Sequence, residues 1–285
     1  IQSGTSLDDL SDAKSEGTDF TGSLLIGHQT TGSLNNAQYN TGVGLAALDA
    51  LTTGDYNVAL GYGSLGATTT GYANTATGAE ALLANTTGYN NTASGWRALY
   101  ANTTGDYNTA SGYQALFSNT TGINNTASGR NALYLNTSGD YNTASGSEAL
   151  YSNTTGINNT ASGSSALYSN TTGDYNTATG AEALLANTTG TRNIAIGYRA
   201  YDAADTEDDN LAIGYDALGG AVAGGTKNIA IGNYSLDANT SGINNTAIGY
   251  DAMTTNIGGD KNTSVGFQSL QANTEGNKNV AVGMY

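Results

Sequence analysis

Acidic residues gather in one short stretch of this sequence, and clustered carboxylates can bind a hard cation. The segment "DAADTEDDN" at 202–210 contains five of them. Carboxylate oxygens are ligands that Ca²⁺ prefers, although the spacing here differs from that of an EF-hand loop. The segment is therefore a weak calcium candidate, weighed against a solvated acidic turn. The candidate ligands are Asp202, Asp205, Glu207, Asp208 and Asp209.

Aromatic residues recur at two fixed positions, and aromatic rings can contact sugars. The first set is more typical of ladder stacking or subunit packing than of glycan contact. In the second set each tyrosine follows an aspartate, a pairing that suits sugar binding as well as a solvated turn. The first set contains Tyr100, Phe117, Tyr134, Tyr151 and Tyr168; the second contains Tyr107, Tyr141 and Tyr175, beside Asp106, Asp140 and Asp174.

Catalytic chemistry has little support in the remaining residues. The chain has no cysteine and a single histidine, His28, which we expect on the surface of a terminal coil. No Ser/His/Asp set or carboxylate pair stands apart from the repeats described below, so no general base or nucleophile can be assigned. We expect no enzyme activity and, calcium aside, no cofactor.

Charge and hydropathy argue against two further classes of partner, nucleic acids and membranes. The net charge is −15, with only 8 Lys and Arg residues scattered along the chain. Phosphate contacts need clustered basic residues, so nucleic-acid binding is not expected. No apolar run approaches the roughly 20 residues that cross a bilayer, and the first residues lack a signal-peptide pattern, so membrane insertion is not expected.

A 17-residue repeat positions all of these residues. Glycine closes an N-x-A/S/G-x-G motif at regular steps, interrupted by one 18-residue step between Gly214 and Gly232. A unit of 17 residues is too short for a pair of helices and matches one coil of a β-solenoid. The motif glycines are Gly44, Gly61, Gly78, Gly95, Gly112, Gly129, Gly146, Gly163, Gly180, Gly197, Gly214, Gly232, Gly249, Gly266 and Gly283, with Gly27 one step earlier.

The repeat predicts an all-β fold, a parallel β-solenoid of about sixteen coils. Within each coil the Thr-Ala-Ser and Ala-Leu-aromatic triplets are predicted to be two short strands. The Asn-Thr-Thr-Gly segment is predicted to turn, because Gly and Asn tolerate positive φ. The solenoid domain is assigned to residues 23–285, after an N-terminal connector or cap at 1–22.

Strand alternation decides which side chains face the interior. Ala110 lies on one face and Thr109 and Ser111 on the other, so Ala110 and Leu116, with their repeats, are predicted to line the coil. Stacking should also align asparagines in hydrogen-bonded ladders. The predicted ladders are Asn85, Asn102, Asn119, Asn136, Asn153, Asn170 and Asn187, and Asn91, Asn108, Asn125 and Asn142.

The predicted core is thin, which favours oligomerisation. One buried leucine supplies roughly 1.5–3 kcal/mol, while each ordered backbone residue costs about 1–2 kcal/mol. The positions that flank the motif alanine change character along the chain. They are apolar at Val58 and Leu60 and again at Ile194 and Ile196, but Thr or Ser at 92–94 through 160–162.

One turn position alternates between Asp and Ile. Asp106, Ile123, Asp140, Ile157 and Asp174 lie at equivalent places in successive coils. Asp in every coil would place carboxylates about 5 Å apart, whereas alternation doubles the spacing to roughly 10 Å, near the Debye length. We interpret the alternation as a way to stack coils without like-charge repulsion.

Several motifs resemble a known family. "NIAIG" at 193–197, "NLAIG" at 210–214 and "NVAVG" at 279–283 resemble the head repeat of YadA-like trimeric adhesins. "NTASGYQALFSNTTG" at 108–122 is similar to repeats of bacteriophage-type tail-fibre proteins. The resemblance covers about residues 20–285 and implies a left-handed β-roll that forms a homotrimer. It implies a trimer core of Ile194, Ile196, Leu211, Ile213, Ile229, Ile231, Val280 and Val282.

Two functions are compatible with the sequence. The resemblance implies an extracellular structural fibre or adhesin shaft, on a virion or a cell surface, whose partners are itself and a glycan or protein receptor. In its Thr/Ser stretch we expect a polar, hydrated three-fold axis. The alternative is an ice-binding solenoid that uses the Thr-Ala-Ser/Thr array. Exposure distinguishes them, because Thr109 and Ser111 cannot bind ice while facing a trimer axis.

Overall fold

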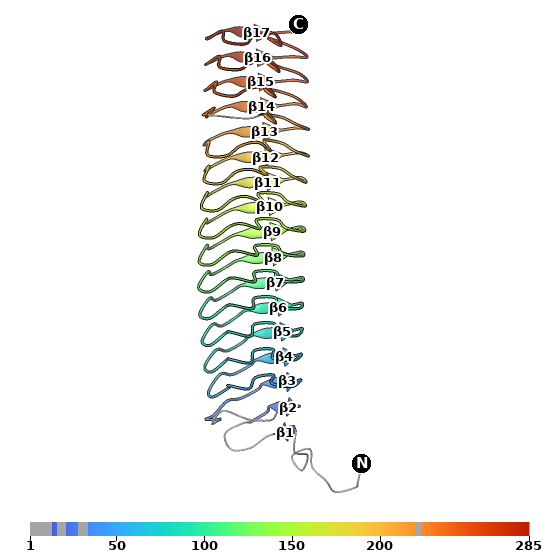
Figure 1. Cartoon of the computed structure of the whole chain (residues 1–285), viewed down its shortest axis with the longest axis vertical. Coiled ribbons are helices and arrows are strands. Elements are labelled where there is room, and N and C mark those ends of the chain that lie inside the picture. The colour runs from blue at the N-terminus through green and yellow to red at the C-terminus, as the bar shows by residue number, and fades with distance from the viewer. Residues whose placement is uncertain (1–12, 16–20, 28–33, 221–223, 285) are drawn as a thin grey trace. The chain divides into compact units, whose positions relative to one another are not determined.

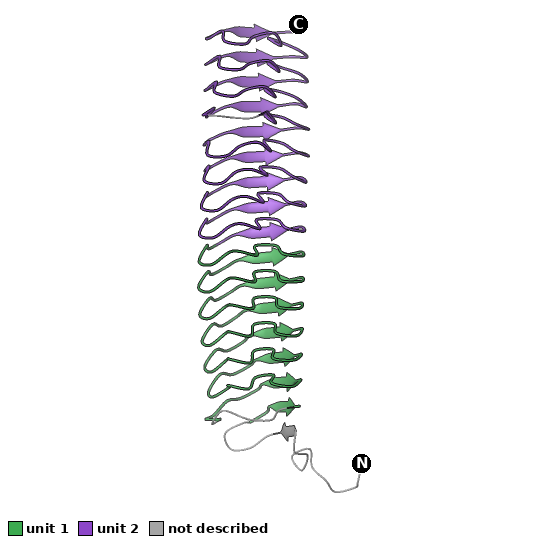
Figure 2. Ribbon diagram, in the orientation of Figure 1, with its two compact units in different colours: residues 1–140 green, residues 141–285 purple. Residues whose placement is uncertain are grey.

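The computed structural model describes residues 13–15, 21–27, 34–220 and 224–284. The chain divides into two compact units, residues 1–140 and 141–285 (Figure 2). Every regular element among the described residues is a three-residue strand, and no helix occurs among them. Each unit is a parallel β-solenoid, and together they account for about sixteen turns.

In the first unit, seven parallel strands pair in chain order, one strand per coil (Figure 1). The eighth strand, β1, pairs with β2 in antiparallel orientation and lies in the segment predicted as a connector. The rest of that segment, apart from 21–22, lies outside the described residues. The strands are β1 (Ala13–Ser15), β2 (Leu24–Ile26), β3 (Thr41–Val43), β4 (Val58–Leu60), β5 (Thr75–Thr77), β6 (Thr92–Ser94), β7 (Thr109–Ser111) and β8 (Thr126–Ser128).

In the second unit, nine strands pair in parallel and again in chain order. The 18-residue step leaves the register intact, because Leu211 pairs with Ile229 and the extra residue falls between the strands. The strands are β9 (Thr143–Ser145), β10 (Thr160–Ser162), β11 (Thr177–Thr179), β12 (Ile194–Ile196), β13 (Leu211–Ile213), β14 (Ile229–Ile231), β15 (Thr246–Ile248), β16 (Thr263–Val265) and β17 (Val280–Val282).

The predicted interior is confirmed. In β7 the central Ala110 is fully buried, whereas Thr109 and Ser111 are exposed. Leu116 and Ala115 of the same coil are also fully buried. Small side chains are required there because a single short coil encloses little volume, and Leu116 fills what the alanines leave.

The prediction of two strands per coil is wrong, because the Ala-Leu segment is a turn. Gln114 and Leu116 have φ of 52° each, in the left-handed region, so the chain between them cannot extend. The Leu116 backbone N–H still donates to the Ala132 carbonyl of the next coil at 2.9 Å. Coil-to-coil hydrogen bonding therefore continues outside the strands without extended backbone.

The chain bends at Asn-Thr-Thr-Gly as predicted, but positive φ at its Asn and Gly is not the reason. Positive φ falls two residues beyond this segment, at Tyr107 and Asn124, and at the motif glycines such as Gly112. Gly122 is needed for space instead, because a Cβ there would lie 2.5 Å from the Asn119 side-chain oxygen and from the Gly139 carbonyl.

Two asparagine ladders cross-link the coils, as predicted. In the first, the Asn108 side-chain oxygen accepts the Asn125 backbone N–H at 3.0 Å, and its amide donates to the Gly122 carbonyl at 2.7 Å. In the second, the Asn119 amide donates to the Asn102 side-chain oxygen at 2.8 Å. All four asparagines are fully buried, so each ladder satisfies backbone groups that water cannot reach.

Candidate functional site

An apolar strip runs along the outward side of β12, β13 and β14; we call it the apolar strand face. Parallel register aligns Ile194 with Leu211 and Ile229 in one row, and Ile196 with Ile213 and Ile231 in the other. Ile194 and Ile196 are 40% and 41% exposed, and the other four are at least partly exposed. Six of the eight predicted trimer-core residues are thus brought together on one surface.

The remaining two predicted trimer-core residues lie in β17. Val280 and Val282 point outward and are 76% and 75% exposed. The intervening strands β15 and β16 carry Thr on one flank and Ile or Val on the other. The strand register therefore carries the two rows on from the apolar strand face to β17, with one row interrupted by threonine.

The same outward positions are hydroxylated in other coils; we call them the hydroxyl strand face. In the first unit this face covers β5–β8, and in the second it covers β9–β11. The flanking Thr and Ser are exposed in every one of these strands except at Thr177, which is half-buried. Within each unit the face repeats one hydroxyl pair per coil.

The first aromatic set stacks from coil to coil, as expected. The Tyr100 and Phe117 ring centroids are 5.0 Å apart with planes 6° from parallel, and Phe117 and Tyr134 are 5.1 Å apart. In the second unit Tyr151 and Tyr168 stack at 5.1 Å. All five rings are half-buried, so one edge of each stack faces outward. Glycan contact by this set stays a prediction.

The aspartates beside the tyrosines of the second set accept hydrogen bonds from backbone N–H groups. The Asp140 side chain accepts the Ile123 N–H at 2.8 Å, and the Asp174 side chain accepts the Ile157 N–H at 2.7 Å. Asp106 accepts the Tyr89 N–H at 2.9 Å, and this carboxylate raises the pKa of the Tyr89 phenol to about 12. The tyrosines that follow, Tyr107, Tyr141 and Tyr175, are 51–55% exposed.

These hydrogen bonds give the aspartates of the Asp/Ile alternation a structural role. Each aspartate at this position accepts a backbone N–H from the turn of the preceding coil. That N–H would otherwise have no partner within the protein. Where two successive coils both supply an acceptor, one is uncharged: Asp260 accepts from Ile243, and Asn277 accepts from Asp260. Acceptors are thus supplied without stacking two carboxylates, consistent with the repulsion argument.

The five candidate calcium ligands do not surround a common point. Three of them instead contact residues of the preceding coil. Asp205 accepts the Thr188 hydroxyl at 2.6 Å. Asp208 accepts the backbone N–H and hydroxyl of Thr191, and Asp209 pairs with the Arg192 guanidinium at 2.6 Å. Arg192 lowers the pKa of Asp209 through this hydrogen bond.

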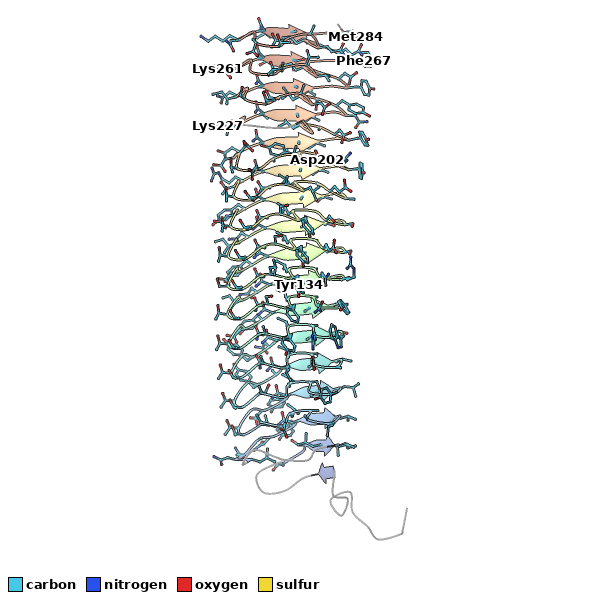
Figure 3. The ribbon with its side chains drawn as sticks, in the orientation of Figure 1. Tyr134, Asp202, Lys227, Lys261, Phe267 and Met284 are labelled. Carbon is cyan, nitrogen blue, oxygen red and sulfur yellow. The ribbon has the colours of Figure 1, made fainter. Side chains whose placement is uncertain are left out.

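The other two candidate ligands are also engaged. Asp202, labelled in Figure 3, pairs with Arg199 at 3.2 Å, and burial raises the pKa of Asp202. Glu207 is buried and accepts backbone N–H groups of Asp205 and Gly224 at 3.0 and 2.9 Å. Across the described residues, no group of three or more His, Cys, Asp or Glu side chains is placed to hold a metal ion.

This irregular coil also contains a buried tyrosine that the repeat does not predict. Tyr201 takes the leucine position, is fully buried, and accepts a hydrogen bond from the Asn210 amide at 2.6 Å. Burial raises the pKa of its phenol. Ala204 replaces the ladder asparagine, and the buried side-chain oxygen of Asn187 is left without a hydrogen-bond partner.

An exposed aromatic row follows the motif glycine and was missed at the sequence level. Its signal is visible in the printed sequence, since the residue after the glycine is Tyr, Trp or Phe in several coils. In the second unit the Tyr198 and Tyr215 ring centroids lie 5.7 Å apart, and those of Tyr250 and Phe267 lie 5.5 Å apart. The exposed members are Tyr62, Trp96, Tyr113, Tyr198, Tyr215, Tyr250 and Phe267.

This exposed aromatic row and the tyrosines of the second set, Tyr107 and its equivalents, lie at different edges of the coil. In Figure 3, Phe267 and Met284 stand for the residue after the glycine, and Lys227 and Lys261 occupy the position of Tyr107 in the repeat. The two pairs lie on opposite sides of the second unit. The two sets therefore form separate candidate contact surfaces.

Comparison with known proteins gives no assignment. No protein-family model matches the sequence, and no curated protein matches it. Among the described residues, no helix has the length and apolarity needed to cross a bilayer. His28, expected on the surface, lies outside the described residues.

Proposed function

We propose that the chain is a structural fibre or adhesin shaft that assembles as a homotrimer. The observation that carries this proposal is the apolar strand face, six aliphatic side chains aligned in two rows on the outward side of three adjacent strands. An exposed aliphatic strip of this regularity favours burial against another surface. The same face in a second and third copy is the natural partner, because parallel repeats match in spacing.

The finer features of this proposal come from the resemblance to YadA-like heads and tail-fibre repeats. They are a left-handed coil, a three-fold axis lined by the apolar strand face, and an extracellular location on a virion or cell. The fibre would present its outer edges to a glycan or protein receptor. The candidate contact surfaces are the first aromatic set, the tyrosines of the second set and the exposed aromatic row. No enzyme activity belongs to this function.

Multi-angle light scattering of the purified chain tests the assembly. The expected mass is three times the 28.8 kDa of one chain, and it should persist on dilution into the nanomolar range. A single species at 28.8 kDa would contradict the proposal. Binding of the labelled protein to intact cells then tests surface attachment separately from assembly.

Ice binding is a second candidate, favoured by the hydroxyl strand face. Its Thr and Ser side chains are exposed in one chain and repeat with strand spacing, about 4.8 Å. An ice-recrystallisation assay run on the same sample separates the candidates. A monomer that inhibits recrystallisation, and loses this activity on Thr109→Tyr, supports ice binding. A trimer without this activity supports the fibre.

A further inference from the structure

We propose that Tyr72 and Tyr89, on a turn edge of the first unit, form an oxidative cross-linking site. Hydrogen peroxide, activated by a haem peroxidase, would join their rings through a carbon–carbon bond. The two tyrosines lie one repeat apart, at the position that Asp106 occupies in the next coil. The pair lies within one chain and one unit, so it exists with or without a trimer. The product would be a second covalent link between two coils that otherwise only the backbone connects.

Stacking holds the two rings in nearly the same orientation. The Tyr72 and Tyr89 ring centroids are 4.8 Å apart, and the ring planes differ by 2°. This separation matches the spacing of neighbouring strands, about 4.8 Å, so one ring is displaced from the other by one coil. The ortho carbons beside the two hydroxyl groups are the atoms at which phenol radicals couple. The stack therefore keeps the reacting carbons of both rings within one coil spacing.

The carboxylate of the next coil can receive the phenol proton of Tyr89. Asp106 accepts the Tyr89 backbone N–H at 2.9 Å, and its side chain also hydrogen-bonds the phenol. Mainly through its charge, Asp106 raises the pKa of this phenol to about 12. The phenol thus keeps its proton at neutral pH, and oxidation must remove an electron and a proton together. A base within hydrogen-bond reach assists that proton transfer.

The surroundings fix Tyr89 and leave Tyr72 accessible. The Tyr107 ring lies edge-on to Tyr89, with centroids 5.3 Å apart and planes at 79°. Tyr89 is half-buried between its two neighbours, whereas Tyr72 is 45% exposed. Ala73 stands where the next coil but one carries Tyr107, so the residue beside Tyr72 is small. Exposed side chains reorient within picoseconds to nanoseconds, so the Tyr72 ring can tilt toward Tyr89.

The reaction balances as a two-electron oxidation. Each phenol gives one electron to the peroxidase and one proton to a base, which is Asp106 for Tyr89 and water for Tyr72. The two radicals form a bond between one ortho carbon of each ring, and the hydrogens on these carbons then move to the phenol oxygens. Two electrons and two protons reduce one hydrogen peroxide to two waters. The chain keeps both phenols and loses two hydrogen atoms.

Two other tyrosine pairs have only part of this arrangement. Tyr39 and Tyr56 stack at 4.9 Å with planes 16° apart, and they are more exposed, at 48% and 59%. The Tyr215 phenol hydrogen-bonds the Asp216 carboxylate, but its ring lies 5.7 Å from Tyr198 and is tilted by 26°. Exposure alone would favour oxidation of Tyr39 and Tyr56. Close parallel stacking combined with a proton acceptor favours Tyr72 and Tyr89.

Limited oxidation of the full chain with hydrogen peroxide and a haem peroxidase tests the proposal. Less than one equivalent of peroxide per chain restricts the reaction to the most reactive of the 19 tyrosines. Thermolysin digestion and tandem mass spectrometry then locate the links. We expect the first link to join Tyr72 to Tyr89. The modified chain should have lost the mass of two hydrogen atoms and should migrate as a single chain on a denaturing gel.

Two tyrosine variants locate the reacting pair. Tyr72→Phe removes one phenol and should abolish the link. Tyr39→Phe, the same change in the more exposed pair, should leave it unchanged. Circular dichroism verifies that each variant is folded.

Two aspartate variants test the proton acceptor. Asp106→Asn should slow the link about tenfold, because the base is lost. The new amide oxygen can still accept the Tyr89 N–H, as the Asn277 side chain does for the Asp260 N–H. Asp140→Asn is the matched control, since Asp140 accepts the N–H of an isoleucine at the equivalent position, and the rate should not change.

Three results would overturn the proposal: a first link between Tyr39 and Tyr56, an unchanged rate for Asp106→Asn, or links that join only different chains and appear as multimers on the denaturing gel. Light scattering of the untreated sample reports on the fibre proposal independently. A trimer in which Tyr72 and Tyr89 do not couple contradicts only the cross-linking site.

Discussion

Strands β9–β11 and β12–β14 of the second unit share one framework and present different surfaces. In both groups the central alanine is buried, and Asn159 and Asn228 make equivalent ladder bonds to the next coil. The outward residues are Thr or Ser in the first group and Ile or Leu in the second. Inward residues therefore specify the coil, whereas outward residues are free to specify what the coil contacts.

The interior tolerates little change because each position meets its own copy one coil away. The motif glycine packs its Cα against the glycine of the next coil, and each ladder asparagine satisfies groups in both directions. Outward strand positions also align with their copies one coil away, but their side chains are exposed and are not enclosed within one chain. If the framework is independent of the surface, inward substitutions should cost the same in both groups of strands, and outward ones should not.

The largest expected effect is loss of a motif glycine. Gly163→Ala and Gly197→Ala lie beside a hydroxylated and an apolar strand, with φ of 144° and 138°. Each new Cβ would overlap the carbonyl of the next motif glycine, Gly180 or Gly214. Urea unfolding should show about 3–5 kcal/mol lost in either case. A clear difference between the two would break the comparison; Ser164→Ala, beside the first site, is the control.

A smaller loss is expected from the ladder. Asn159→Ala removes the acceptor of the Asn176 N–H and the donor to the Gly173 carbonyl, at 2.9 and 2.7 Å. Asn228→Ala removes the equivalent pair in the apolar group. Each should cost about 2–4 kcal/mol, because buried backbone groups lose their partners. Thr155→Ala, on an exposed turn, should cost little. A loss as large as that of the asparagine variants would contradict the ladder's role.

The Asp/Ile alternation predicts a loss that responds to salt. Ile157→Asp places a carboxylate one coil from Asp174, which already accepts the residue 157 N–H. We expect about 0.5–1 kcal/mol of destabilisation at low salt, recovered above roughly 0.5 M NaCl by screening. Ile157→Asn is the uncharged control. A salt-independent loss shared by both variants would show that repulsion is not the cause.

The smallest effect is expected on the outward side of the hydroxylated strands. Thr160→Val keeps the shape of an exposed side chain, and the free energy of unfolding should change by less than about 0.5 kcal/mol. Ile229→Thr on the apolar strand face should cost about 1 kcal/mol, because the isoleucine is buried in the assembly we propose. Equal effects of the two substitutions would remove the distinction between the faces.

Much of the fold was predictable from the 17-residue period, because the same residue pattern recurs in every coil. Buried Ala110 and Leu116 and both asparagine ladders follow from strand alternation and stacking. The second strand was wrongly predicted because the aromatic residue that ends the Ala-Leu-aromatic triplet favours strands, yet Leu116 adopts a left-handed φ. Residue type alone does not signal this, since leucine rarely has positive φ.

The candidate surfaces were only partly predictable. The apolar strand face follows from residue type and register alone. The partners of the acidic segment do not, because its carboxylates bind groups 17 residues earlier, such as Thr188 and Arg192.

The central claim, that outward strand residues build the assembly and inward ones build the coil, is tested most directly by sedimentation equilibrium of two matched double variants. Ile196→Asp with Ile231→Asp charges the apolar strand face, and Ser145→Asp with Ser162→Asp charges the hydroxyl strand face. We predict that the wild type sediments at three times 28.8 kDa, that the first variant falls to 28.8 kDa with unchanged circular dichroism, and that the second retains more trimer. A wild type of 28.8 kDa, or a first variant that remains a trimer, would contradict the claim.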